Sequence, residues 1–193
     1  FGDFTLKSGR NSPYFFNAAK MLNTKFLADL SECYTKTLQE LDVSFDSIYG
    51  PAYKGIFLAS IIGTSLGESD LDIPISFNRK EEKDHGEGGD IVGQLPSGNV
   101  LIVDDVISAG TAARESIEKI KSIGANPKVM LVGLDRQEKG SSEISAKAEL
   151  ENDFGLTVSS IVNLDLLISF VRDEPNFKEF KSDLEEYRSS WGA

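Results

Sequence analysis

The most informative segment of this chain is Val100-Leu-Ile-Val-Asp-Asp-Val-Ile-Ser-Ala-Gly-Thr-Ala112. Its first four residues are aliphatic, which is typical of a strand buried on both faces of a sheet. Two adjacent acids end that run, and a turn of small residues leads into an amphipathic helix predicted over residues 112–123, with Gly124 as its stop. A buried strand followed directly by a helix is the repeating unit of a parallel α/β fold.

The same alternation of apolar runs and helical patterns extends outward from this stretch. We predict further strands at 45–49, 73–77, 129–134 and 158–162, and helices at 56–66, 145–154 and 164–171. A helix capped by Asn23 or Thr24 should run to about Leu41, a hairpin should form from 4–6 and 14–16, and a polar, peripheral helix should span 177–187. The fold class is therefore α/β, with a central, mainly parallel sheet flanked by helices.

Composition and charge limit the classes of function. The chain has 193 residues, of which 40% are hydrophobic and 26% charged, as expected for one globular, soluble domain over 1–193. The net charge of -11 disfavours duplex nucleic acid and anionic membranes as partners of the whole surface. A single cysteine, Cys33, no visible signal peptide and no apolar run approaching roughly 18 residues lead us to expect a cytoplasmic protein.

The turn after the acids has the chemistry of a phosphate cradle. Small residues let backbone N–H groups approach an anion, and the start of the following helix adds unpaired N–H groups and the positive end of its dipole. Ser108 and Thr111 add hydroxyl donors, while Asp104 and Asp105 lie beside the turn, where ribose hydroxyls and a metal would lie. A bare Asp-Asp pair would more simply be a solvated strand end, so the argument depends on the whole pattern.

The whole pattern resembles the phosphoribosyl pyrophosphate (PRPP) motif of the type I phosphoribosyltransferases. The resemblance implies that the acids serve the ribose hydroxyls and the Mg²⁺ region and that the turn holds the 5-phosphate. It therefore assigns PRPP binding to the nine consecutive residues Asp104, Asp105, Val106, Ile107, Ser108, Ala109, Gly110, Thr111 and Ala112. Ser108 stands where threonine is frequent in the family, and either residue supplies the hydroxyl.

Two segments before this motif narrow the resemblance to the orotate phosphoribosyltransferases. The stretch 4–17 looks like the N-terminal hood of that family, expected within about 1–20, with Lys7 as a PRPP contact and Phe15 and Phe16 as flat surfaces for a base. The stretch 49–55 can present N–H groups, Tyr53 and Lys54 to pyrophosphate. Taken singly, an exposed lysine, two core aromatics and a plain strand–turn–helix remain open alternatives.

The segment 77–89 is the most specific of the additional matches. It contains Arg79, Lys80 and Lys83, the single histidine His85 and three glycines, but also four acids, so a solvated charged loop is the alternative. It resembles the catalytic loop that, in the orotate phosphoribosyltransferases, reaches the active site of the neighbouring subunit. The resemblance implies that these four residues contact PRPP and pyrophosphate, with Lys83 and His85 catalytic beside Asp104 and Asp105.

One arginine indicates which base the protein would bind. Arg136 follows the predicted strand 129–134 and could form a bidentate pair with a carboxylate, which orotate has and adenine, guanine and hypoxanthine lack. The resemblance implies that Arg136 binds orotate together with Phe15, Phe16 and Ser108. The alternative is a surface arginine paired with Asp135 or Glu138.

The resemblance implies a complete reaction. Orotate and PRPP would give orotidine 5'-monophosphate and pyrophosphate in pyrimidine biosynthesis, with Mg²⁺ held mainly by substrate and water. The resemblance also implies a homodimer in which the 79–89 loop of each subunit reaches the neighbouring active site. It further implies a leading helix before Phe1. Three alternatives stay open: a phosphoribosyltransferase for a purine or uracil, a PRPP-sensing regulator without catalysis, and an unrelated nucleotide-binding α/β protein. The hood and Arg136 count against the first alternative, and the net charge of -11 counts against the second.

Overall fold

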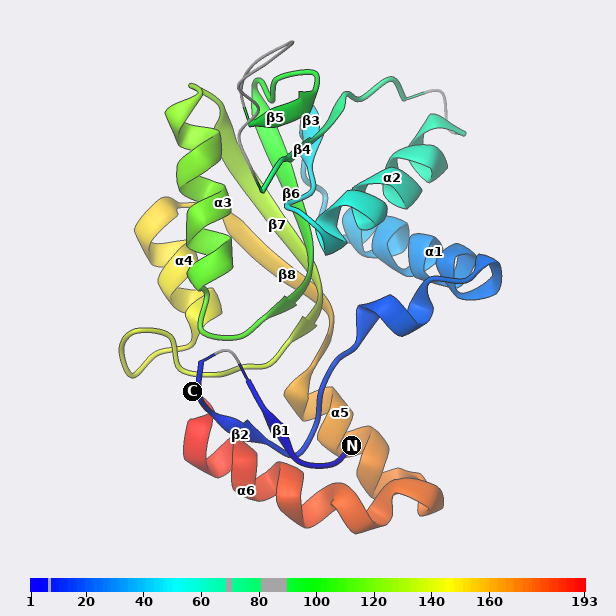
Figure 1. Cartoon of the computed structure of the whole chain (residues 1–193), viewed down its shortest axis with the longest axis vertical. Helices are drawn as coiled ribbons and strands as arrows, with labels where there is room; N and C mark the ends of the chain where they lie inside the picture. Colours follow the sequence, from blue (N-terminus) through cyan, green and yellow to red (C-terminus); the bar gives the residue numbers. More distant parts are fainter. Residues whose placement is uncertain (7, 69–70, 81–89) are drawn as a thin grey trace.

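The computed structural model describes residues 1–6, 8–68, 71–80 and 90–193. Its centre is a six-stranded sheet of order β5-β4-β3-β6-β7-β8 (Figure 1). The strands are β3 (Ser47–Tyr49), β4 (Ile75–Asn78), β5 (Ile91–Gly93), β6 (Asn99–Ile107), β7 (Asn126–Asp135) and β8 (Thr157–Asn163). All neighbouring pairs are parallel except β4 and β5, so the prediction of a mainly parallel sheet is confirmed.

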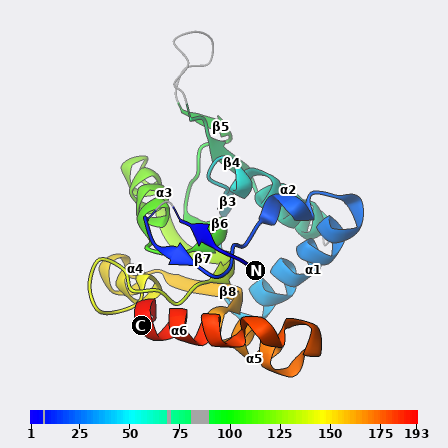
Figure 2. The same ribbon diagram turned by 60° about the horizontal axis from the view of Figure 1, so that its bottom comes forward.

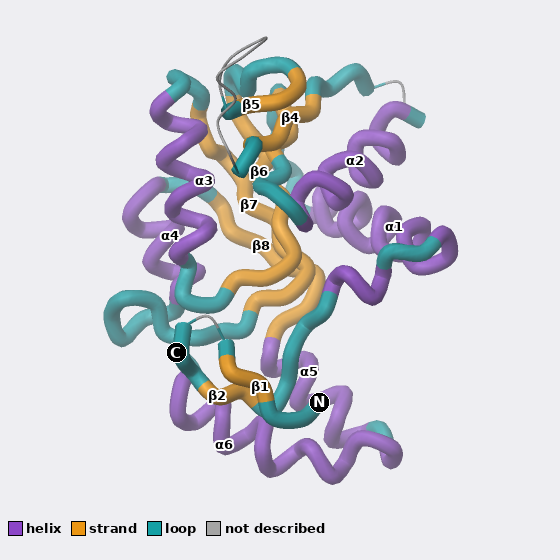
Figure 3. Tube along the Cα trace, viewed as in Figure 1, coloured by secondary structure: helices purple, strands orange, loops and turns teal. Residues whose placement is uncertain are grey.

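Helices cover both faces of the sheet, as the tube in Figure 3 shows. On one face lie α1 (Thr24–Glu40) and α2 (Lys54–Gly67), and on the other lie α3 (Thr111–Ser122) and α4 (Ala146–Phe154). Because side chains alternate along a strand, β6 and β7 divide their apolar residues between two clusters. Leu101, Val103, Val129 and Leu131 pack with α1 and α2, and Val100, Ile102, Met130 and Val132 pack with α3 and α4.

Local signals explain where three of the helices begin. The side chains of Asn23, Ser145 and Asn163 accept hydrogen bonds from the backbone N–H three residues on, at 3.1, 3.1 and 2.9 Å. Each therefore satisfies one of the N–H groups that a helix start leaves unpaired. The cap predicted for the first helix is thus confirmed at Asn23.

A second layer lies at one end of the sheet. The hairpin of β1 (Phe4–Thr5) and β2 (Asn11–Ser12) packs beside α5 (Leu164–Asp173), η2 (Pro175–Phe180) and α6 (Lys181–Trp191), as Figures 1 and 2 show. Its apolar cluster joins residues from both ends of the chain: Tyr14, Leu134, Leu164, Val171, Leu184 and Tyr187. The N-terminal hairpin therefore shares its support with the C-terminal helices.

Several sequence-based expectations differ from the structure. The second hairpin strand is Asn11–Ser12 instead of 14–16, and the antiparallel edge strand β5 was not predicted. The polar helix expected over 177–187 is η2 followed by α6; most of its residues are exposed, but Leu184 and Tyr187 are 0% and 4% exposed and form part of the second layer. Strand β6 continues to Ile107, so the two acids lie within its last residues instead of after it. Among the described residues, no helix is both long and apolar enough to cross a membrane.

Candidate active site

A pocket of about 620 Å³ opens where β3, β4, β6 and β7 end. Parallel strands present their carboxyl ends at one edge of a sheet, so residues that follow different strands meet there. Among the residues singled out from the sequence, those that line the pocket are Phe15, Phe16, Tyr53, Lys54, Lys80, Asp104, Asp105, Val106, Ser108, Ala112 and Arg136. The structure therefore brings five separate sequence segments to one cavity.

The two acids are held by strand β6 and by contacts from two helices. Asp105 is 5% exposed, and its Oδ2 accepts a hydrogen bond from Nζ of Lys54, the first residue of α2, at 2.5 Å. The Oδ1 of Asp104 accepts a hydrogen bond from the backbone N–H of Asp105 at 2.9 Å, and the Asp104 carbonyl accepts one from the hydroxyl of Tyr34 on α1. Burial, and then the neighbouring Asp105, raise the pKa of Asp104 to about 7.

The turn between β6 and α3 has the geometry of an anion site. Gly110 adopts φ +83°, which disfavours other residues, and a Cβ there would lie 3.3 Å from the Cβ of Ala146. It precedes Thr111, the first residue of α3, whose unpaired N–H groups follow. Ser108 and Ala112 line the pocket, whereas the side chain of Ile107 is 2% exposed and packs in the core. Ile107 can therefore offer a ligand only its backbone.

The rim of the pocket is cationic. Nζ of Lys80 lies 4.9 Å from the ring centroid of Tyr53, which is 69% exposed. Asn78 joins this rim to the 50–53 turn, because its Oδ1 accepts a hydrogen bond from the backbone N–H of Ala52 at 2.8 Å. Lys54, Lys80 and Tyr53 therefore lie where a pyrophosphate could be held.

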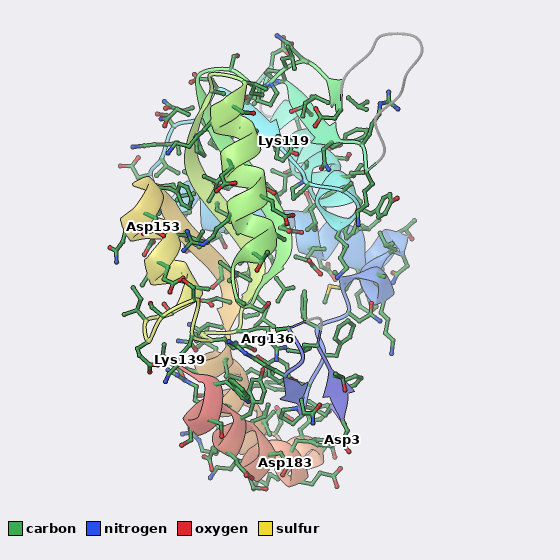
Figure 4. All side chains as sticks on the ribbon, turned by 60° about the vertical axis from the view of Figure 1, so that its left-hand side comes forward. Asp3, Lys119, Arg136, Lys139, Asp153 and Asp183 are labelled. Atoms are coloured by element: carbon green, nitrogen blue, oxygen red, sulfur yellow. The ribbon has the colours of Figure 1, made fainter. Side chains whose placement is uncertain are left out.

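The base-recognition candidates Phe15, Phe16 and Arg136 line the same pocket. Phe15 is 48% exposed and Phe16 is partly buried, so neither is a core residue. Arg136 is 3% exposed, so the interpretation as a surface arginine is wrong, although its Nε does donate to Glu138. Figure 4 shows Arg136 where the end of the sheet meets the hairpin and α6.

The remaining predicted site residues either lie outside the described residues or are not part of the cavity wall. Lys7, Lys83 and His85 lie outside the described residues. Arg79 is described and partly buried, and its backbone N–H donates to the carbonyl of Asp90 at 2.6 Å, but its side chain is not part of the pocket wall. Ala109, Gly110 and Thr111 do not line the cavity; they form the backbone of the turn and the first residue of α3.

Sequence reasoning missed one wall of the pocket. Glu115, Ser116 and Lys119 of α3 line the cavity beside Ala112. Lys119, labelled in Figure 4, forms an ion pair with Asp90. Their spacing from Ala112 follows a helical period, so these residues share one face of α3. That spacing could have indicated them, since the start of the helix was already assigned to the site.

The donor set fits Mg²⁺ only in part. The adjacent carboxylates of Asp104 and Asp105 offer the hard oxygen ligands that Mg²⁺ prefers. No cluster of three or more metal-binding side chains occurs within the described ranges. The residues present therefore fit an ion that takes most of its ligands from substrate oxygens and water.

Comparison with known proteins agrees with this site. A family model described as the phosphoribosyl transferase domain matches residues 19–150, a span that contains the acids, the cradle and the Lys54 turn. The chain therefore belongs to the phosphoribosyltransferase family. Within that family it groups with the orotate phosphoribosyltransferases, which confirms the narrower resemblance inferred from the sequence.

Relatives and solved structures support that grouping. The chain is 50% identical over 193 residues to orotate phosphoribosyltransferase of Pseudomonas syringae pv. syringae and 49% identical over 194 residues to that of Escherichia coli O139:H28. Each match covers 100% of this chain and 91% of the relative. The crystal structure of the Francisella tularensis orotate phosphoribosyltransferase superposes with a TM-score of 0.81 at 38% identity, covering 100% of this chain and 93% of that chain.

Proposed function

We propose that this chain transfers the 5-phosphoribosyl group of PRPP to orotate, giving orotidine 5'-monophosphate and pyrophosphate in the de novo synthesis of UMP. The main support for this proposal is that one pocket combines an acid pair and a phosphate cradle with two aromatic rings and an arginine. The names of the relatives support the same reaction and count against purine, uracil and purely regulatory alternatives.

In this proposal the acids and the turn hold the ribose phosphate. Asp104 and Asp105 accept hydrogen bonds from the ribose hydroxyls, while N–H groups of the Ser108–Thr111 turn bind the 5-phosphate. Because Nζ of Lys54 donates to Oδ2 of Asp105 at 2.5 Å, the Asp105 side chain is held in place at the pocket wall. The ribose would therefore lie between the Ser108–Thr111 turn, which binds its 5-phosphate, and the cationic rim of the pocket.

The rim stabilises the leaving group. Departure of pyrophosphate develops positive charge on the ribose ring and negative charge on the leaving oxygens. Lys54 and Lys80 supply positive charge where that anion forms, and Tyr53 supports Lys80 through its ring. We also assign to the leaving group Lys7, Arg79, Lys83 and His85, with Lys83 and His85 acting directly on it. No nucleophilic side chain is required, because orotate itself attacks the ribose.

A second group of pocket residues selects the base. Phe15 and Phe16 provide surfaces on which a planar pyrimidine can stack, and Ser108 offers a hydroxyl donor. Arg136 lines the same cavity and carries a permanent positive charge suited to the orotate carboxylate. A purine or uracil, which lacks that carboxylate, would leave the guanidinium without its ionic partner.

Mg²⁺ belongs to the proposal as a partner of the substrate. When bound, it neutralises the phosphate oxygens of PRPP and makes pyrophosphate a better leaving group. Asp104 and Asp105 would hold it through their carboxylates or through ribose hydroxyls and water. This assignment follows from the donor chemistry of the two acids.

We further propose a homodimer in which the 79–89 segment of one subunit serves the site of the other. The ion pair of Asp90 with Lys119 holds the residue that follows this segment at the edge of the pocket, and the exchange itself rests on the family resemblance. The single domain over 1–193 and the hood within about 1–20 are part of the same proposal, with the hood extended by the C-terminal helices. A cytoplasmic location stays a prediction.

The test is an absorbance assay of orotate consumption with PRPP and Mg²⁺, run in parallel with uracil, adenine and hypoxanthine. Of the four bases, only orotate is expected to be converted. Arg136→Ala should raise the KM for orotate about 30-fold or more, because loss of a desolvated charge pair costs on the order of 2–4 kcal/mol. The KM for PRPP should stay within about twofold. Equal turnover of a purine, or equal effects of the substitution on both KM values, would contradict the proposal.

A further inference from the structure

The guanidinium of Arg136 is held by a set of contacts that the reaction itself does not require. Its Nε donates to Oε1 of Glu138 at 2.5 Å, and its Nη2 donates to Oγ of Ser12 at 2.7 Å and to the hydroxyl of Tyr187 at 3.0 Å. A guanidinium has five N–H donors, and these bonds use three of them. Within the described part of the chain, the two N–H groups of Nη1 make no hydrogen bond, so they are the donors that Arg136 can offer to the pocket.

Two aromatic rings limit rotation of the same group. The Cζ of Arg136 lies 4.0 Å from the ring centroid of Tyr14 and 5.4 Å from that of Tyr187. The two rings meet edge to face, at 86°. A cation over the face of a tyrosine is attracted to the ring, and a planar guanidinium packed this way has few other orientations.

Glu138 is the centre of the hydrogen-bonded set. Its side chain is 0% exposed, and its two oxygens are shared between two arginines, with Oε1 on Arg136 and Oε2 on Arg10 at 2.7 Å. The Tyr187 hydroxyl donates to Oε1 at 2.6 Å while it accepts from Arg136, which closes a ring of three side chains. Because Arg10 also pairs with Glu138, the cluster keeps a net positive charge that can attract an anionic base.

The C-terminal end of the chain fixes this cluster in place. The backbone N–H of Lys139 donates to the carbonyl of Trp191 at 2.9 Å, and that of Ala193 donates to the carbonyl of Gln137 at 3.1 Å. The guanidinium of Arg10 lies 4.8 Å from the ring centroid of Trp191. The backbone around Glu138 is therefore tied to the end of α6, which also carries Tyr187.

We propose that Glu138 and Tyr187 are positioning residues for base selection, which fix Arg136 so that only its Nη1 edge faces the base. The inference rests on the proposed role of Arg136 toward orotate. A preoriented guanidinium meets a carboxylate without losing side-chain freedom on binding, whereas a free one would have to be ordered first. Without Glu138, the buried cation would lose its counter-ion and turn toward the pocket or solvent. The C-terminal helix is thereby a specificity element, although it contributes no wall to the cavity.

The test uses two isosteric substitutions and one matched control. Tyr187→Phe removes a hydroxyl that makes two hydrogen bonds, and Glu138→Gln removes the counter-ion while keeping the shape. Tyr14→Phe is the control, because the Tyr14 hydroxyl is buried and has no hydrogen-bond partner among the described residues. For each purified protein, the KM for orotate, the KM for PRPP, kcat and Tm are measured.

The expected result is a selective loss of base affinity. Tyr187→Phe and Glu138→Gln should each raise the KM for orotate about tenfold, with the KM for PRPP and the values for Tyr14→Phe within about twofold of the unsubstituted protein. A purely structural role would lower Tm without that selectivity, and proportional changes in both KM values would overturn the inference. The inference would also be overturned if the KM for orotate of both variants stayed within twofold of that of the unsubstituted protein. If one variant fails to fold, the other decides by the same criteria.

Arg136→Ala separates this inference from the proposed function. If that substitution leaves the KM for orotate unchanged, the role of Arg136 in base binding is wrong and the positioning role falls with it. If Arg136→Ala raises the KM for orotate and the two positioning variants do not, only the positioning inference is overturned.

Discussion

Replacing Asp104 with asparagine should stabilise the free protein above pH 7 while reducing its activity. Asp104 lies in the last part of β6, where burial and then the charge of Asp105 raise its pKa to about 7. Its Oδ1 accepts a hydrogen bond from the backbone N–H of Asp105 at 2.9 Å, and an asparagine oxygen can accept the same bond. The substitution therefore removes an unfavourable charge and keeps the local hydrogen bond.

The magnitude follows from the pKa shift. A rise from 3.8 to about 7 is about three units, and each unit corresponds to about 1.36 kcal/mol, so the ionised form of Asp104 is disfavoured by at most about 4 kcal/mol. The folded pKa lies above the unfolded value, so the protein keeps this stability below about pH 4 and loses it as the pH rises through about 7. Because asparagine does not titrate, the stability difference should grow over that range to about 1–4 kcal/mol.

The assay is urea unfolding followed by circular dichroism at pH 5.5 and pH 8, without PRPP or Mg²⁺. Asp29→Asn, on the exposed part of α1, serves as the matched control and should change neither value. Asp104→Asn should unfold at a higher urea concentration, with the larger gain at pH 8. A gain that is equal at the two pH values, or a loss of stability at pH 8, would refute the reasoning.

Three further predictions concern the acid pair, the sharing of sites between subunits, and Glu149. The double substitution of Asp104 and Asp105 by asparagine should leave the circular dichroism spectrum unchanged and nearly abolish orotate turnover, so retention of most activity would count against the motif. When that double variant is mixed with Lys83→Ala, about a quarter of the normal activity should be recovered if subunits share sites. About half of the dimers are then mixed, and each mixed dimer has one intact site of two. If mass spectrometry shows subunit exchange but no activity is recovered, sharing is excluded. Hydrogen bonds from Ser142 and Ser141 lower the pKa of Glu149 to about 2, so its contribution to stability is present above about pH 4.3 and lost as the pH falls toward 2. Glu149→Gln should therefore lower the free energy of unfolding more at pH 7 than at pH 3, and an equal loss at both would contradict this.

The local part of the site could be predicted from the sequence because its residues are neighbours along the chain. Asp104, Asp105 and the turn to Thr111 follow one another directly, so a buried strand, two acids and a helix start determine their arrangement. The parallel sheet was predictable for a related reason, since apolar runs alternated with helical patterns over most of the chain. The strand boundaries were less accurate, because Asp104 and Asp105 interrupt the apolar run, yet β6 continues through them to Ile107 and stays paired with β7.

The surroundings of Arg136 depend on contacts between distant parts of the chain, which the sequence did not predict. Arg136 is joined to Ser12 across 124 residues and to Tyr187 across 51 residues, and Glu138 is joined to Arg10 across 128. Such contacts depend on which distant surfaces pack together, and a polar side chain far along the chain leaves no periodic pattern that would indicate its partner. For the same reason α6 resembled a peripheral helix from its composition: its few apolar residues gained their meaning only when the N-terminal hairpin packed against them. Local sequence patterns were thus enough to predict the sheet, the acids and the cradle, whereas the orientation of Arg136 results from long-range packing of charged and aromatic side chains.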